Sequence, residues 1–281
     1  MKSILLTGGS GYLGRHLAKR LLADGWERIC IFSRGEHRQA KMRMELKDDP
    51  RLRWFIGCVR DPNRLERAMQ GCEVVIHCAA LKRIEVGFYA PDEMIKTNVI
   101  GSMNVVEAAA SAGVKKCLLV SSDKAYQPVS PYGQAKALAE SIFLTANNVW
   151  PNGPRYACCR YGNVWGSTGS VVPTWKKALE TGGTILITNP YCTRFFMTVD
   201  QAVELVLHTA ETMQGGEMVI PELPAYQLGD LLNAIAPHRA VCVTGLPKWE
   251  KIHESMSKDK CSKDARRMTI TELQEALNGV A

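Results

Sequence analysis

The sequence lacks several features that mark membrane, secreted and metal-binding proteins. No apolar run approaches the roughly 18 residues that a membrane-spanning helix needs, so no membrane partner is expected. The ten cysteines include no CxxC pair, and in a chain of 281 residues without an export signal we expect neither a disulfide framework nor a metal site. Met1-Lys2 lead straight into a predicted strand, which indicates no signal peptide and a cytoplasmic protein.

A concentrated basic face is missing as well. The formal net charge is +7, but lysines and arginines alternate with acids, except from Lys258 to Arg267, which we interpret as a solvated region. We therefore expect no nucleic-acid partner, and the basic excess suits an anionic small molecule. An apolar fraction of 46% and a charged fraction of 22% are typical of a globular protein.

A glycine-rich turn at the start of the chain indicates a dinucleotide site. Residues 3–7 form a predicted buried strand, residues 15–23 a predicted helix, and Gly8, Gly11 and Gly14 lie between them. Glycines at this spacing allow a tight turn, close approach of a pyrophosphate to backbone amides, and close helix packing. The cofactor contacts expected here are Gly8, Ser10, Gly11, Tyr12, Leu13 and Gly14.

The end of the second predicted strand, residues 28–32, favours NADP over NAD. Ser33 and Arg34 stand where an acid would bind the ribose 2′-hydroxyl of NAD. An arginine beside a small hydroxyl suits the 2′-phosphate of NADP. The alternative is that Arg34 is a solvated loop residue.

Strands and helices alternate through the first half of the chain. This rhythm predicts an α/β, Rossmann-type doubly wound parallel sheet, with one long helix over residues 91–112. We expect an NADP-binding domain over 1–163 that also carries the catalytic residues. Residues 164–281 would form mainly a smaller substrate-binding lobe, with some segments returning to the sheet. In that part helices are predicted at 175–180, 199–213 and 228–235, a strand at 185–188, and a linker at 221–224, while residues 193–196 precede the helix at 199–213.

The candidate catalytic residues follow the predicted strand 116–120. Ser122, Asp123 and Lys124 come directly after it, at the edge where open α/β sheets bind ligands. A helix beginning at residue 131 places Tyr132 and Lys136 on one face. We expect the ammonium group to lower the pKa of the phenol, so that Tyr132 can act as an acid or base.

These residues resemble those of the extended short-chain dehydrogenase/reductases over essentially the whole chain. In detail they are similar to one branch, the inverting UDP-N-acetylglucosamine 4,6-dehydratases of pseudaminic acid biosynthesis. The Asp-Lys pair after the fifth strand and the EKxHE run at 250–254 are the most specific features. The matching stretches are TGGSGYLG, FSRGE, VRD at 59–61, HCAALKRIE, IKTNVIGSMNV, SSDKA, PYGQAK, RYGNVWGS with GSVVP, TRFF, and GLPKWEKIHESM.

The resemblance implies a lyase and gives each catalytic residue a role. Tyr132, assisted by Lys136, takes the proton of the sugar 4-hydroxyl, whose oxygen Ser122 holds. Lys124 is the base at C5, and Asp123 protonates the departing 6-hydroxyl. A lysine base requires a pKa lowered by burial or by a nearby cation, whereas burial of Asp123 would keep that acid protonated.

The resemblance also implies binding residues and a homo-oligomer formed through the helices 92–112 and 131–147. Further cofactor contacts are implied at Ser33, Arg34, Cys58, Val59, Ala79, Ala80, Lys82, Asn98, Tyr132, Lys136 and Tyr161. The implied contacts to a nucleotide sugar, with UDP as the expected nucleotide, are Lys82, Asn163, Val171, Arg194, Lys248 and Glu250.

Three positions depart from the family pattern. Cys58 replaces an acid, Thr168 replaces an arginine, and Pro247 stands in a run where the family carries another arginine. Two arginines that would face phosphates are thus absent, and Lys248 offers a point charge in place of one. Two alternatives stay open: a nucleotide-sugar 4-epimerase or related dehydratase with a different substrate, and an NADP-binding regulatory protein without activity.

Overall fold

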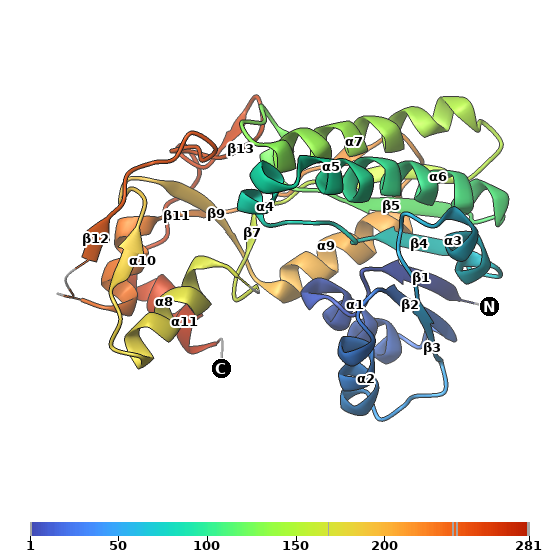
Figure 1. The fold of residues 1–281 in the computed structure, drawn as a ribbon, viewed down its shortest axis with the longest axis horizontal. Coiled ribbons are helices and arrows are strands. Elements are labelled where there is room, and N and C mark those ends of the chain that lie inside the picture. The colour runs from blue at the N-terminus through green and yellow to red at the C-terminus, as the bar shows by residue number, and fades with distance from the viewer. Residues whose placement is uncertain (1, 168, 238, 240, 280–281) are drawn as a thin grey trace.

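A seven-stranded sheet is the centre of the computed structural model, which describes residues 2–167, 169–237, 239 and 241–279 (Figure 1). Its strand order is β10-β6-β5-β4-β1-β2-β3, and every neighbouring pair is parallel. This confirms the predicted doubly wound, Rossmann-type fold. The strands are β1 (Ser3–Thr7), β2 (Arg28–Ser33), β3 (Leu52–Ile56), β4 (Val74–His77), β5 (Lys116–Val120), β6 (Arg155–Cys159) and β10 (Met218–Val219).

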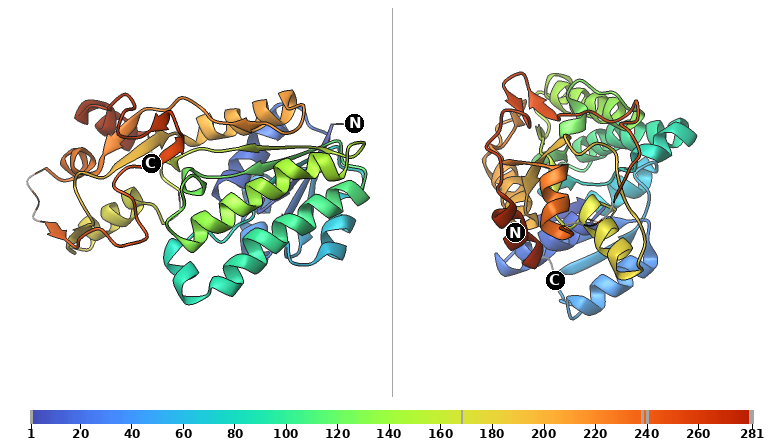
Figure 2. Two further views of the ribbon diagram at one scale, coloured as in Figure 1. Left: turned by 90° about the horizontal axis from the view of Figure 1, so that it is seen from above. Right: turned by 90° about the vertical axis from the view of Figure 1, so that its left-hand side faces the viewer.

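Helices cover both faces of this sheet, as Figure 2 shows from above. Side chains alternate along β1, so Ile4 and Leu6 pack on one helical layer and Leu5 on the other. Burial on both faces explains why the strands read as unbroken apolar runs. The first layer holds α1 (Tyr12–Ala23), α2 (Glu36–Glu45) and α9 (Val199–Thr212), and the second holds α3 (Pro62–Met69), α6 (Gly101–Ser111) and α7 (Pro131–Val149).

The helix predicted over residues 91–112 is not one regular α-helix. α5 (Pro91–Met94) passes into a π-helical stretch, η1 (Ile95–Ile100), before α6 begins. Within this stretch Asn98 accepts a hydrogen bond from the Leu81 amide at 2.8 Å and donates one to the Leu81 carbonyl at 2.9 Å. The wider turn therefore coincides with the side chain that holds the loop after β4, and π-helical turns often occur at functional sites.

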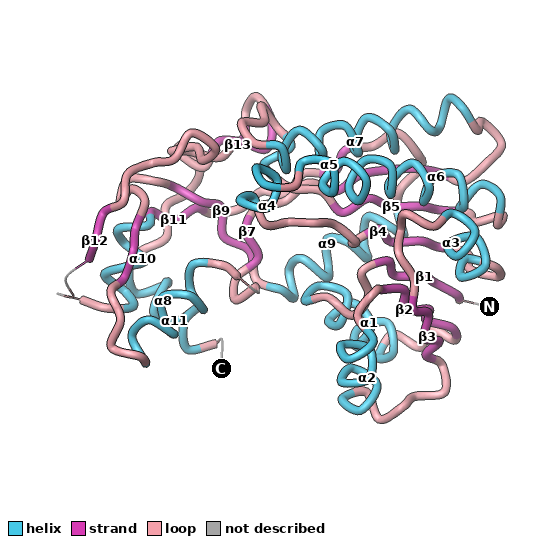
Figure 3. The backbone as a smooth tube through the Cα atoms, viewed as in Figure 1, coloured by secondary structure: helices cyan, strands magenta, loops and turns pink. Residues whose placement is uncertain are grey.

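A second, smaller group of elements surrounds the sheet β11-β9-β7, where the strands are short and the loops long (Figure 3). Its core includes Trp165, Trp175 and Tyr226. The elements are β7 (Asn163–Val164), α8 (Val171–Glu180), β8 (Ile185–Ile187), β9 (Thr193–Met197), β11 (Ala225–Gln227), α10 (Leu228–Ile235), β12 (Val241–Val243), β13 (Ser255–Ser257), β14 (Lys260–Cys261) and α11 (Ile270–Asn278).

The structure adds one strand to this region and corrects the start of one helix. Residues 193–197, for which no element was predicted, form the fully buried strand β9, which lies between β7 and β11 and carries the buried Arg194 among its apolar side chains. The helix predicted at 175–180 begins earlier, at Val171. Helix α9 and strand β10 pack with the large sheet, and the domain division at residue 163 stays a prediction. None of the described helices is long and apolar enough to cross a membrane.

Candidate active site

The glycine turn lies at the point where the strand order of the sheet reverses. Gly8 has φ +67°, and a Cβ atom there would lie 2.9 Å from the Ala79 backbone, so only glycine allows the ends of β1 and β4 to approach so closely. Gly11 begins α1 without a side-chain cap. The first amides of α1 are thus available to an anion, and the turn fits the pyrophosphate of a dinucleotide.

The loop after β2 is held by hydrogen bonds between side chains. The hydroxyls of Ser10 and Ser33 lie 2.8 Å apart, and the Gln39 amide donates to Ser33 Oγ and to the Phe55 carbonyl, both at 2.9 Å. Arg34 follows directly and is exposed. Gln39 was not found by sequence reasoning, because a glutamine in a polar helix carries no distinguishing signal.

The Asp123–Lys124 pair sits in a single 3₁₀ turn, η2 (Asp123–Ala125), just past β5. Ser122 Oγ donates to Asp123 Oδ1 at 2.9 Å, and Lys124 Nζ donates to the same oxygen at 3.2 Å. Asp123 is only 1% exposed, and its Oδ2 has no hydrogen-bond partner among the described residues. Burial raises the pKa of Asp123, which agrees with the expectation that this acid holds a proton.

Tyr132 and Lys136 lie in the first turns of α7, beside this pair. Ser130 caps the helix by accepting the Gly133 amide at 3.2 Å. Tyr132 and Lys136 are 8% and 4% exposed. The Lys136 ammonium donates to the Val120 carbonyl at 2.7 Å and so lies under the strand end.

The pKa expected for Tyr132 is corrected by this geometry. Burial raises the pKa of the Tyr132 phenol and outweighs the opposing effects of the Lys124 ammonium and of a hydrogen bond with Ser122. Lys136 is on the expected helix face, but its charge is directed at a carbonyl oxygen. Burial in turn lowers the pKa of Lys136.

A third element of the site comes from the distant segment 250–254. Glu254 is 2% exposed, and its Oε1 lies 3.5 Å from Lys124 Nζ. Lys251 Nζ lies 3.6 Å from Glu254 Oε2 and donates to the Tyr126 carbonyl at 2.6 Å. Sequence reasoning noticed the EKxHE run without giving Glu254 or Lys251 a role, since nothing local links residue 254 to residue 124.

The pKa of Lys124 also differs from the expectation. Burial lowers it, but the carboxyl groups of Asp123 and Glu254 raise it by more, so the net pKa lies above that of an ordinary lysine. The expectation of a lowered pKa for Lys124 is therefore wrong. It rested on burial and neighbouring cations, whereas two acids lie beside the ammonium group.

Two of the candidate substrate residues bind each other. Arg194 is 5% exposed and forms an ion pair with Glu250, and it also donates to the Thr193 carbonyl at 2.7 Å. Asn163 is half-buried, and its Oδ1 has no hydrogen-bond partner in the described part of the chain. Such an acceptor is suited to a ligand, because buried polar atoms are normally paired.

The remaining candidates are spread around this edge of the sheet. Tyr12 donates from its hydroxyl to the Trp165 carbonyl at 3.0 Å and so joins α1 to the smaller group of elements. Val171 is the first residue of α8, whose N-cap makes no side-chain hydrogen bond. Thr168 lies outside the described residues. Val59 and Tyr161 are buried, Leu13, Cys58, Ala80 and Pro247 half-buried, and Lys82 and Lys248 exposed.

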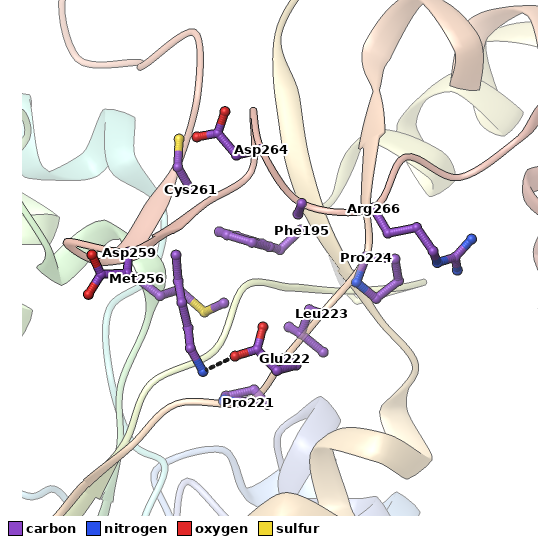
Figure 4. Close-up of a pocket in the computed structure, with 12 residues that line it drawn as sticks. Phe195, Pro221, Glu222, Leu223, Pro224, Met256, Asp259, Cys261, Asp264 and Arg266 are labelled. Carbon is purple, nitrogen blue, oxygen red and sulfur yellow. Dashed lines mark ion pairs between the residues drawn. The ribbon is translucent and has the colours of Figure 1, made fainter.

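An open pocket of about 420 Å³ lies away from these residues, between the 221–224 segment and the β13–β14 hairpin (Figure 4). Its lining includes Phe195, Met256 and the ion pair of Lys260 with Glu222 at 2.7 Å, but no candidate catalytic residue. The described residues contain no group of three His, Cys, Asp or Glu side chains placed to hold a metal ion. The candidate active site is at the carboxyl end of β5, where Asp123, Lys124 and Lys136 lie together.

A Rossmann-type sheet with this glycine turn and a Tyr-x3-Lys pair defines the short-chain dehydrogenase/reductase class. Residues 4–274 match the model of the family described as polysaccharide biosynthesis protein, and the chain belongs to that family. It is 43% identical over 258 residues to a protein of Campylobacter jejuni named UDP-N-acetylglucosamine 4,6-dehydratase (inverting), covering 91% of this chain and 77% of that protein. This confirms the resemblance found in the sequence.

Other relatives and solved structures share the fold. A Rickettsia rickettsii protein named UDP-glucose 4-epimerase is 36% identical, with 83% of this chain and 70% of that protein covered. The crystal structure of Pen from Bacillus thuringiensis has a TM-score of 0.95 at 27% identity, over 99% of this chain and 97% of that one. The dTDP-glucose 4,6-dehydratase DesIV of Streptomyces venezuelae, solved with NAD, has a TM-score of 0.85 at 20% identity, over 98% and 96% of the two chains.

Proposed function

We propose that the protein is an NADP-dependent nucleotide-sugar 4,6-dehydratase that acts on UDP-N-acetylglucosamine and inverts C5. The observation that carries this proposal is the pair of the buried Asp123 with the half-buried Lys124, beside Tyr132 and Lys136. The Tyr-Lys pair alone serves oxidation at C4, whereas the second acid and base are what removal of water requires. The name of the Campylobacter relative supports the same reaction.

The glycine turn and the loop after β2 would hold NADP. The uncapped first amides of α1, which follow Gly11, suit the pyrophosphate, and Arg34 beside Ser33 suits the 2′-phosphate. When bound, the nicotinamide would supply reversible hydride chemistry: the hydrogen of C4 would leave as a hydride, and that hydride would return to C6 after water is lost. We propose the other cofactor contacts implied by the sequence, Cys58, Val59, Ala79, Ala80, Lys82, Asn98 and Tyr161, as lining residues.

The protein's own residues would move the protons. Tyr132 accepts the proton of the 4-hydroxyl, and the resulting 4-ketone acidifies the proton on C5. Lys124, after losing its own proton, accepts that of C5, while Asp123 gives its proton to the 6-hydroxyl, which leaves as water. A proton returned to the opposite face of C5 completes the inversion. Burial, which raises the pKa of Asp123, suits its role as the acid of the leaving-group step.

The nucleotide diphosphate would lie toward the smaller group of elements. The unpaired Asn163 Oδ1 and the uncapped amides at Val171 offer an acceptor and donors for it. Arg194 and Lys248 supply positive charge, and the ion pair with Glu250 holds Arg194 in place.

We also propose a homo-oligomer. α6 and α7 lie side by side on one face of the sheet, and both expose apolar side chains outward. Association with a second subunit would remove these apolar side chains from water. These side chains are Met103 on α6 and Leu138 and Val149 on α7.

A 4-epimerase is the second candidate, favoured by the relatives of that name in Rickettsia. Epimerisation needs only the chemistry of Tyr132 and Lys136 at C4, and it gives the Asp123–Lys124 pair no task. The products separate the two reactions, since an epimerase returns a sugar that still carries its 6-hydroxyl.

The test is incubation of the purified protein with UDP-N-acetylglucosamine in D₂O, followed by NMR and mass spectrometry. We expect a 4-keto-6-deoxy product with deuterium at C5 and the L-configuration. Tyr132→Phe is expected to lower the rate by roughly 10²- to 10⁴-fold while cofactor stays bound. Formation of the 4-epimer would support the second candidate, and unchanged substrate with bound cofactor would show that the sugar or nucleotide is a different one.

A further inference from the structure

Glu254 joins the candidate active site from a part of the chain that carries no proposed catalytic residue. We infer that Glu254 is a positioning residue that fixes which members of the Asp123–Lys124 pair hold protons. The inference rests on the proposed dehydratase function and deepens it, because it names what sets the acid–base state of that site.

The carboxylate of Glu254 is fixed in place by its backbone. The Glu254 amide donates to Ser262 Oγ at 2.9 Å, and the Ser262 amide donates back to the Glu254 carbonyl at 2.7 Å. Ser262 Oγ lies in turn 2.7 Å from Thr193 Oγ1 on the buried strand β9. Glu254 is thus anchored to the sheet of the smaller group of elements, and its side chain extends from there to Lys124.

The geometry allows one ionised carboxylate to act on two groups. Oε1 is 3.5 Å from Lys124 Nζ, and the same ammonium is 3.2 Å from Asp123 Oδ1, so the lysine lies between two acids. Glu254 is 2% exposed and Asp123 1%. Charges at such separations interact strongly when water is excluded.

The directions of the pKa shifts agree with this arrangement. Burial raises the pKa of Asp123, and the charge of Glu254 raises it further. Glu254 itself stays ionised, because Lys124, Arg194 and Lys251 together outweigh its burial and lower its pKa.

The charge of Glu254 acts on Lys124 as well as on Asp123, but its effect on the base is unfavourable for catalysis. The negative charge of Glu254 raises the pKa of Asp123, which favours the protonated acid that the reaction needs. The same charge raises the pKa of Lys124, which opposes the unprotonated base that the reaction needs. Tyr132 and Arg194 also face this cluster, and Arg194 opposes the effect on Lys124. Removal of the charge on Glu254 should therefore lower the pKa of both Asp123 and Lys124.

The experiment compares pH profiles of the full-length protein and three variants. Glu254→Gln keeps the size of the side chain and removes its charge. We expect both limbs of the profile for 4-keto-6-deoxy product formation to move to lower pH by about one unit or more. Glu254→Asp, which withdraws the carboxylate from Lys124 by one methylene, should show a smaller shift of the same sign.

A matched control is Glu222→Gln, which removes an exposed carboxylate that forms an ion pair with Lys260. Its profile should match the wild type. A Glu254→Gln enzyme that is slower but has unmoved limbs would show a purely structural role and overturn the inference. If Glu254→Gln does not fold, a Glu254→Asp enzyme whose pH profile is the same as that of the wild type would also overturn the inference.

A second measurement needs no substrate. Titration of the Asp123 carboxyl by ¹³C NMR should give a lower pKa in Glu254→Gln than in the wild type. If the wild type makes no 4-keto-6-deoxy product but the Asp123 pKa falls, the proposed function fails and the inference about the pair stands. If the product forms and the Asp123 pKa is unchanged, the inference fails and the function stands.

Discussion

Replacement of Gly133 by alanine tests whether α7 is packed directly against the Asp123–Lys124 turn. A methyl group at residue 133 would overlap the Lys124 carbonyl oxygen and lie 2.9 Å from Pro128 Cβ. Carbon–oxygen contacts normally need about 3.3 Å, so either the helix or the turn must shift. The atoms that would move are backbone, and the turn carries the side chain of Lys124.

Two opposing contributions decide the stability of Gly133→Ala. Alanine is favoured over glycine in a helix by about 1 kcal/mol, whereas overpacking typically costs about 1–3 kcal/mol. We expect a net loss of up to about 2 kcal/mol in the free energy of unfolding. The effect on catalysis should be larger, because a misplacement near 1 Å costs about 100-fold in rate.

Urea unfolding and the rate of 4-keto-6-deoxy product formation measure the two effects of Gly133→Ala. The control is Gln134→Ala, which adds alanine at the next, exposed position of the same helix and should leave rate and stability near the wild type. A Gly133→Ala protein that is about 1 kcal/mol more stable and fully active would refute the close packing of α7 on the turn.

Two further predictions concern the cofactor loop and the core. Arg34→Ala should weaken NADP binding by roughly 10- to 100-fold with little effect on NAD, measured by calorimetry, since a charge-assisted contact to the 2′-phosphate is lost; equal effects on both cofactors would contradict the assignment. Burial lowers the pKa of His77 from 6.5 to about 3. The unfolded chain therefore takes up a proton first, and stability falls as the pH drops below 6.5. At pH 5 this group should account for about 2 kcal/mol of the loss by urea unfolding, and a His77→Gln protein should lose less between pH 6.5 and 5 than the wild type; an identical loss would show that His77 does not titrate in this way.

Much of the large sheet was predictable because both of its faces are buried. Strand 74–77 was predicted with the bounds that the structure has, and strand 116–120 likewise, since an apolar run bounded by turns is a strong local signal. The glycine turn and the Tyr132–Lys136 spacing are also local patterns. They identified the resemblance without knowledge of the fold.

What escaped prediction depends on contacts between distant segments. The strand at 193–197 contains a buried arginine, so its sequence does not show the apolar pattern of a strand until Glu250 is placed beside it. The π-helical stretch at 95–100 coincides with a hydrogen-bonded pair between Asn98 and Leu81. The pKa of Lys124 could not be inferred for the same reason, because its second acid is Glu254.

The contact between Lys124 and Glu254 limits how this architecture can be recombined. The two residues are separated by 130 positions in the sequence, yet Lys124 Nζ lies 3.5 Å from Glu254 Oε1 in one ion pair. A chimera that takes residues 1–163 from one relative and the remainder from another would exchange substrate contacts and acid–base chemistry together. If residues 164–281 are replaced by those of a relative to alter sugar preference, we therefore expect activity only when that relative carries an acid at the position of Glu254.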